Sequence, residues 1–140
     1  MVTMIGVIGA LLALLLALAD DERDRESIAA RVQALPVAPL AAGAQGELSL
    51  LLLESPEPSL PLALRIDAGS VALVENRVGW SAVVDPQALQ PRLRAPFSAP
   101  SEPGTYGVRA SVDYQVCAGE WCRHKRGEVE WTIEVLAPMP

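Results

Sequence analysis

The sequence predicts an all-β protein, an antiparallel β-sandwich that follows an N-terminal signal peptide. A long alternation of apolar and polar residues fills the C-terminal end, and shorter alternating runs precede it. Gly- and Pro-rich stretches separate these runs, as turns separate short strands. No stretch after Ala19 has a convincing helical period. Short strands in two packed sheets are the architecture that buries such one-sided apolar faces.

Residues 1–19 are predicted to be a secretory signal peptide. Residues 5–18 form an unbroken apolar run, shorter than the roughly 20 apolar residues of a membrane-spanning helix but typical of a signal-peptide core. Ala17-Leu18-Ala19 fits a small-x-small cleavage site. No Lys or Arg precedes the run, so an uncleaved membrane anchor is the alternative. The expected location is the periplasm or the secreted fraction, with membrane contact only through an uncleaved signal.

Composition argues against nucleic acid as a partner and favours a disulfide over a metal site. The chain has 11 basic and 17 acidic residues, a net charge of -6, so nucleic acid is a poor partner. Two cysteines in an exported chain are more often a disulfide than a metal site. We expect residues 20–27 to be a flexible, charged lead-in and residues 28–140 to be one sandwich domain.

The first part of this domain contains one ambiguous segment and one clear strand. Residues 28–35 fit a short helix capped by Ser27, and they fit a short edge strand equally well. Residues 47–53 are a continuous apolar run, which predicts a central strand with both faces covered. The Pro-rich residues 55–61 end this strand.

Shorter strands follow in the middle of the chain. Alternation predicts half-buried strands at residues 62–67 and 92–97, and a turn leads from the first of these into another strand at residues 71–75. Residues 76–90 are less regular and include Trp80.

Residues 105–136 are predicted to be a long β-hairpin with both cysteines near its tip. The connection is expected to be the four residues 118–121, which include Gly119. If Cys117 faces Cys122, the turn sets every other pair. The resulting apolar pairs are Val108 with Trp131, Ala110 with Val129 and Tyr106 with Ile133, and the charge pairs are Asp113 with Arg126 and Arg109 with Glu130.

This register places both sulfurs on the polar face of the hairpin, beside Gln115 and His124. Reachable sulfurs are therefore expected, bonded to each other if the local pair is closely spaced. Arg123 and Lys125 face the other way, and the run from Arg123 to Arg126 is interpreted as a solvated strand edge.

The strand before the cysteines resembles a known family. Tyr114, Gln115, Cys117, Ala118 and Cys122 are similar to the final hairpin in the N-terminal periplasmic domain of the thiol:disulfide interchange protein DsbD family. The resemblance covers residues 28–136 in strand order. It implies an immunoglobulin-like sandwich whose cysteine pair accepts electrons from a membrane carrier and passes them to periplasmic partners. The chain departs from the family in its four-residue cysteine spacing and in the basic run after Cys122.

The resemblance implies a role for particular residues. Cys117 and Cys122 would be the redox pair, and Trp80, in the loop of residues 77–85, would correspond to an aromatic cap. The alternative for Trp80 is a place in the core. Trp121 at the tip is expected to anchor a partner or to pack over the disulfide, and Tyr114, Gln115 and His124 are expected to support the pair.

The predicted function is thiol–disulfide exchange, by a possible oxidoreductase module whose partners are periplasmic thiol–disulfide proteins or a membrane electron carrier. The alternative is a non-catalytic secreted β-sandwich that binds or acts as a scaffold and holds a structural disulfide. His124 and the two cysteines lack a fourth ligand, so no metal is predicted, and no other cofactor is expected.

Overall fold

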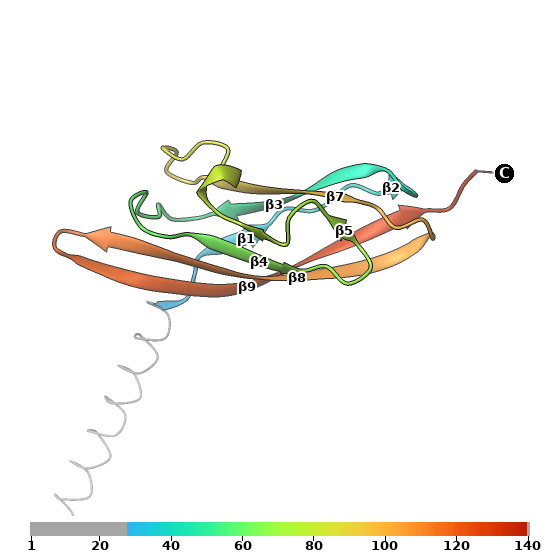
Figure 1. Cartoon of the computed structure of the whole chain (residues 1–140). Helices are drawn as coiled ribbons and strands as arrows, with labels where there is room; N and C mark the ends of the chain where they lie inside the picture. Colours follow the sequence, from blue (N-terminus) through green and yellow to red (C-terminus); the bar gives the residue numbers. More distant parts are fainter. Residues whose placement is uncertain (1–27, 140) are drawn as a thin grey trace, which may run out of the picture.

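Two β-sheets pack face to face in the computed structural model, which describes residues 28–139 (Figure 1). The predicted signal peptide at residues 1–19, the lead-in at residues 20–27 and Pro140 lie outside the described residues. The four-stranded sheet has the order β1 (Val32–Ala34), β3 (Gln45–Leu52), β7 (Arg92–Ser98), β5 (Ala72–Leu73). The five-stranded sheet has the order β2 (Leu40–Ala41), β9 (Trp121–Leu136), β8 (Gly104–Ala118), β4 (Ala63–Asp67), β6 (Arg77–Val78).

The connections make this an immunoglobulin-like sandwich, as the sequence predicted. The chain crosses between the sheets from β3 to β4 and again from β7 to β8, and β3 and β7 are neighbours in one sheet. This matches the arrangement of the B, E, C and F strands of immunoglobulin domains. The hydroxyl of Tyr106, near the start of β8, donates to the Glu102 carbonyl at 2.7 Å, which is the tyrosine corner of such folds.

Residues 28–35, ambiguous in sequence, contain a strand. β1 pairs antiparallel with β3, with Val32 opposite Leu52 and Ala34 opposite Leu50. The Leu35 N–H donates to the Ser49 carbonyl at 2.9 Å. Pairing with the open edge of β3 satisfies these backbone groups, and a short helix at this place would leave that edge unpaired.

The prediction that both faces of residues 47–53 are covered is wrong for one face. Leu48, Leu50 and Leu52 on β3 are at most 1 % exposed, whereas Ser49 and Leu51 between them are only half-buried. One face of β3 packs on the second sheet, and no further sheet of residues 28–139 covers the other face.

Alternate residues of both sheets form the core between them. Trp131 on β9 spans this layer, because its indole Nε1–H donates to the Ser49 carbonyl on β3 at 3.0 Å. The largest side chains that are almost fully buried belong to Leu48, Leu50, Leu52, Leu64, Leu93, Phe97, Val108, Val112, Tyr114 and Ile133.

The β8–β9 hairpin runs the length of the molecule (Figure 1). All five pairs predicted from the cysteine register are present. The connection is shorter than expected, since Ala118 and Trp121 are themselves paired and only Gly119 and Glu120 lie between them. Gly119 has φ of 61° and Glu120 has no positive φ, the pattern of a type II′ turn with glycine first.

The end of the hairpin extends past its neighbours. The pairing of β4 with β8 stops at Asp113, and beyond it a loop residue, Glu57, donates its N–H to the Gln115 carbonyl at 2.7 Å. Within the described chain no other strand pairs with residues 116–123, which we call the arm. No helix among residues 28–139 is both long and apolar enough to cross a membrane.

Candidate functional site: the disulfide on the arm

Cys117 and Cys122 face each other across the arm and are joined by a disulfide, with their Cα atoms 4.0 Å apart. Ala118 and Trp121 flank the two-residue turn as a hydrogen-bonded pair, so the next pair along is of the non-hydrogen-bonded type. Cα atoms approach most closely in such pairs, which makes this position suitable for a direct bond.

The disulfide lies on the outer face of the five-stranded sheet. Cys122 is exposed and Cys117 is half-buried. Both alternate with inward-facing neighbours, Val116 on one strand and Arg123 on the other, which are half-buried. The prediction that the sulfurs lie outward and side by side agrees with this arrangement. A molecule approaching from solvent therefore meets the Cys122 side of the bond first.

Polar residues continue along this face from the disulfide. Gln115 and His124 form the next cross-strand pair, and Asp113 and Arg126 form the one after. The Asp113 Oδ1 lies 3.0 Å from His124 Nε2 and 3.0 Å from Arg126 Nε. Asp113 therefore contacts both side chains, and the Arg126 guanidinium on this face is directed toward a carboxylate.

Trp121 and Arg123 occupy the opposite face of the arm. Trp121 is 54 % exposed, and the guanidinium carbon of Arg123 lies 5.1 Å from the centre of its ring. This distance is typical of a cation–π contact. Strand alternation places Trp121 on the side away from the sulfurs, so its contact is with Arg123. Its role as a partner anchor stays a prediction.

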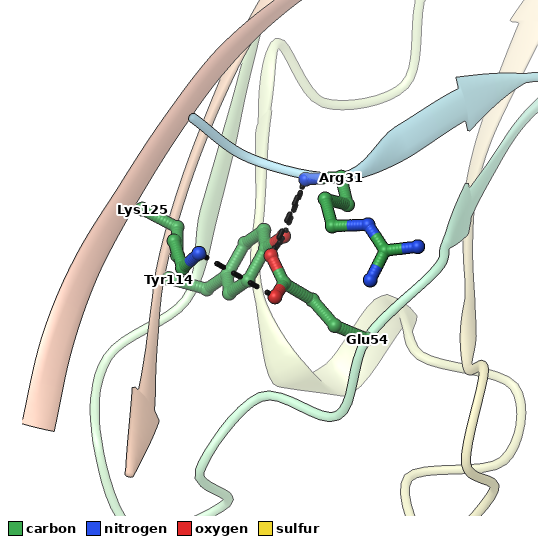
Figure 2. A network of polar contacts seen from close by, with 4 residues as sticks. All are labelled: Arg31, Glu54, Tyr114 and Lys125. Atoms are coloured by element: carbon green, nitrogen blue, oxygen red, sulfur yellow. Dashed lines mark hydrogen bonds and ion pairs between the residues drawn. The ribbon is translucent and has the colours of Figure 1, made fainter. Parts of the chain in front are cut away.

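A buried polar network lies at the base of the arm, on its inner face (Figure 2). Lys125 Nζ lies 3.6 Å from Glu54 Oε2, and the Tyr114 hydroxyl donates to Glu54 Oε1. The Arg31 backbone N–H points into the same group, 3.0 Å from the Tyr114 oxygen and 3.3 Å from Glu54 Oε1. Four segments of the chain meet here: the start of β1, the end of β3, β8 and β9.

Burial sets the protonation of the phenol in this network. It raises the pKa of Tyr114 well above its usual value of 10.0, and the hydrogen bond to the Glu54 carboxylate raises the pKa further. The hydrogen bond with the Arg31 backbone N–H lowers the pKa of Tyr114, but this effect is smaller than either of the two that raise it. Tyr114 therefore stays protonated and remains a donor to Glu54.

The interpretation of Arg123 to Arg126 as a solvated edge is wrong for Lys125, which is 8 % exposed. The inner-face alternation of β9 continues through this residue, opposite Tyr114. That alternation is the sequence pattern that indicates an inward position for Lys125. Glu54 has only a weak signal in the sequence, because it is the charged residue that follows an apolar run. The sequence does not indicate that Glu54 and Lys125 meet.

Trp80 lies in the 3₁₀ turn η1 (Trp80–Ala82), half-buried against the core. Its indole Nε1–H donates to the Leu60 carbonyl at 2.8 Å, in the loop that also reaches Gln115 through Glu57. The loop thus lies between Trp80 and the hairpin. The cap over the cysteines that the resemblance implied stays a prediction.

No cluster of three or more His, Cys, Asp or Glu side chains with metal-binding geometry occurs within residues 28–139. Among the described residues, every buried side-chain nitrogen and oxygen has a hydrogen-bond partner.

The protein is thus a two-sheet β-sandwich with a disulfide at the end of its last hairpin. No protein-family model matches the chain, and no curated protein matches it. Among solved structures it is similar to Escherichia coli α2-macroglobulin from domain MG7 to the C-terminus, with 19 % identity and a TM-score of 0.42. That match covers 78 % of this chain and 17 % of the macroglobulin chain.

A second similar structure is AggA, the major subunit of aggregative adherence fimbriae type I from Escherichia coli. It has 9 % identity and a TM-score of 0.34, over 78 % of this chain and 98 % of that chain. Both similarities are weak, and the fold of this chain is defined by its own sheet order.

Proposed function

We propose that this is an exported thiol–disulfide exchange domain that acts through Cys117 and Cys122, in the manner that its resemblance to the DsbD N-terminal domain implies. The observation that carries the proposal is the position of the bond: on the outer face of an arm, with Cys122 exposed. Exchange requires that a thiolate reach one sulfur, and the exposure of Cys122 supports the proposal.

The reaction balances with a dithiol partner. A partner thiolate attacks Cys122 Sγ, the Cys117–Cys122 bond breaks, and its electron pair leaves on Cys117 Sγ, which takes up a proton. The second partner thiolate then attacks the mixed disulfide and releases Cys122 as a thiolate. The partner is oxidised to a disulfide and this domain is reduced to a dithiol. The reverse sequence passes the electrons on to an oxidised partner.

The electrostatics of the site support a modest reactivity. Cationic neighbours lower the pKa of a cysteine and make it a better leaving group. Here Lys125 pairs with Glu54 on the inner face and Arg126 pairs with Asp113. Neither directs its charge at the sulfurs, so we expect no strong activation of the leaving thiolate.

The reduction potential tests the proposal. The protein is equilibrated in glutathione buffers of defined ratio, and the fraction with free thiols is measured by alkylation. A potential above about -300 mV is expected for an exchangeable bond, and a value below it contradicts the proposal. A Cys117→Ser variant whose Cys122 is activated as the mixed disulfide with thionitrobenzoate should in addition trap a thioredoxin variant that keeps only its nucleophilic cysteine, because that thiolate attacks Cys122 Sγ and thionitrobenzoate leaves. The Cys122→Ser variant is the matched control and should trap less, because Cys117 is half-buried.

A second candidate function is a non-catalytic secreted binding or scaffold module with a structural disulfide. The observation that favours it is the isolation of the arm, which has no neighbouring strand within the described residues. A two-stranded ribbon is marginally stable by itself, so a cross-strand bond there would stabilise it. A potential below about -300 mV supports this candidate.

A further inference from the structure

The outer face of the five-stranded sheet has a hollow of about 770 Å³ that lies away from the disulfide. Residues of β6, β4, β8 and β9 line it. Strand alternation directs the side chains of Arg65, Arg77, Arg109 and Ser111 into this face. The hollow is thus a polar surface that no other layer of the described chain covers.

Arg65 and Arg77 are placed unfavourably for the protein alone. They are directly opposite each other in the β4–β6 pair, and both are exposed. Like charges in directly opposite positions repel and destabilise a strand pair. Neither guanidinium forms an ion pair with another residue of 28–139. The protein as a whole has a net charge of -6, so two adjacent arginines without an ion pair among residues 28–139 are an exception to its acidic character.

The other charges around the hollow define its polarity. Arg109 is opposite Asp67 on β4 and lies 3.9 Å from the Glu130 carboxylate, so its charge is compensated. Arg65, Ser111 and Glu128 form one row across three strands. Two arginines against one carboxylate, Asp67, therefore make the β4–β6 side of the hollow positive, and Glu128 and Glu130 make the β9 side negative. The Ser111 hydroxyl lies between the two sides.

We propose that Arg65 and Arg77 form a binding site for a small molecule that carries a carboxylate or phosphate group. Guanidinium groups bind such oxyanions through paired, charge-assisted hydrogen bonds, and two of them side by side match a multiply charged group. The Ser111 hydroxyl, in the same row as Arg65, is placed to donate a further hydrogen bond. A bound anion would remove the repulsion between the two arginines. The site does not depend on the disulfide or on its exchange.

Titration with inorganic phosphate and with citrate, followed by amide NMR at low ionic strength, tests the site on the whole domain. Saturable shifts are expected at β4, β6 and Ser111. The double variant R65A/R77A should weaken binding by about a hundredfold, since each of the two lost charge-assisted contacts accounts for roughly tenfold. R65K/R77K keeps the positive charges but loses the planar, two-pronged guanidinium groups. Its affinity for the anions should therefore lie between that of the parent and that of R65A/R77A. Preference for citrate would assign a carboxylate ligand, and preference for phosphate a phosphorylated one.

The matched control is Arg94→Ala, which removes an arginine of β7 in the other sheet that pairs with Glu47 at 3.5 Å. This variant should bind the anions as the parent does, and so should a Cys117→Ser/Cys122→Ser variant. Thermal unfolding supplies a second measurement: R77A should raise Tm without ligand and should abolish the rise in Tm that citrate produces. Shifts spread evenly over the surface, or equal losses in R94A and R65A/R77A, would overturn the proposal.

Discussion

Lys125 lies directly opposite Tyr114 in the hairpin, and the Glu54 carboxylate contacts both side chains. This brings an ion pair into the inner layer of the sandwich at the base of the arm, where the two side chains are 10 % and 15 % exposed. The proposed exchange at the disulfide depends on where the arm points. The contacts of Glu54 fix that direction from the inner side, opposite the sulfurs.

Glu54→Gln should lower the free energy of unfolding by about 2–3 kcal/mol. It leaves the Lys125 ammonium desolvated without a counter-charge, and partial exposure puts the cost below that of a fully buried pair. Urea unfolding measures it. The matched control is Glu130→Gln, the same chemical change in the exposed pair with Arg109, which should cost about 1 kcal/mol or less. Equal costs would show that the Glu54 pair is no more important than a surface pair.

Tyr114 should make the stability fall at high pH. Burial raises its pKa above 10.0, so the unfolded chain releases the phenol proton at a lower pH than the folded one. The contribution is complete below about pH 10 and is lost as pH rises above it, by up to about 1.4 kcal/mol per pH unit. Unfolding in urea from neutral to alkaline pH measures this slope.

Tyr114→Phe tests the origin of that slope. It should cost about 1 kcal/mol at neutral pH, because the Arg31 N–H and Glu54 each lose a partner. The variant should also show a smaller decline above pH 10. Tyr106→Phe, which retains Tyr114, should keep the parental decline. A parental slope in the Tyr114 variant would assign the alkaline loss to other groups.

Replacing both cysteines by serine should cost about 2 kcal/mol, since the bond closes a short loop and short loops gain little chain entropy. The sandwich should remain folded, because the core lies between the sheets and does not include the disulfide. Amide exchange should accelerate in residues 116–123 and stay unchanged in β3 and β7. Loss of the whole fold on reduction would mean that the arm organises the sandwich.

Gly127→Ala should lower the stability by about 1–2 kcal/mol. A Cβ at this position would lie 2.9 Å from the Cβ of Ala30, so the start of the N-terminal strand would have to shift. Gly107→Ala in the same hairpin is the matched control. Its Cβ would meet only the flexible end of Glu130 at 3.3 Å, and this variant should be neutral or slightly stabilised. Thermal unfolding of the two variants measures the difference.

Local pattern was enough to predict the hairpin. Alternation placed Val108 against Trp131 and Asp113 against Arg126, because a period of two defines the faces of a strand and one turn sets all pairs beyond it. The length of the turn was not predicted correctly. Gly119 adopts positive φ, which allows a tight two-residue connection where a four-residue one was equally compatible with the sequence.

The conformation and burial of short segments could not be predicted from their sequence pattern alone and depended on the tertiary structure. Residues 28–35 satisfy a helical and a strand pattern alike, and the open edge of β3 decided for the strand. Similarly, the run at residues 47–53 shows that the strand is buried, but the number of layers that cover it depends on the rest of the fold.

The sequence by itself determined the all-β class, the cysteine pair and the outward position of the sulfurs, since each follows from alternation over neighbouring residues. Only the tertiary structure decided that Glu54 meets Lys125 and Tyr114, and that Arg65 lies opposite Arg77. Those contacts join residues that are far apart in the chain or in separate strands, and their positions depend on how the sheets pack. Local periodicity carries no information about that packing.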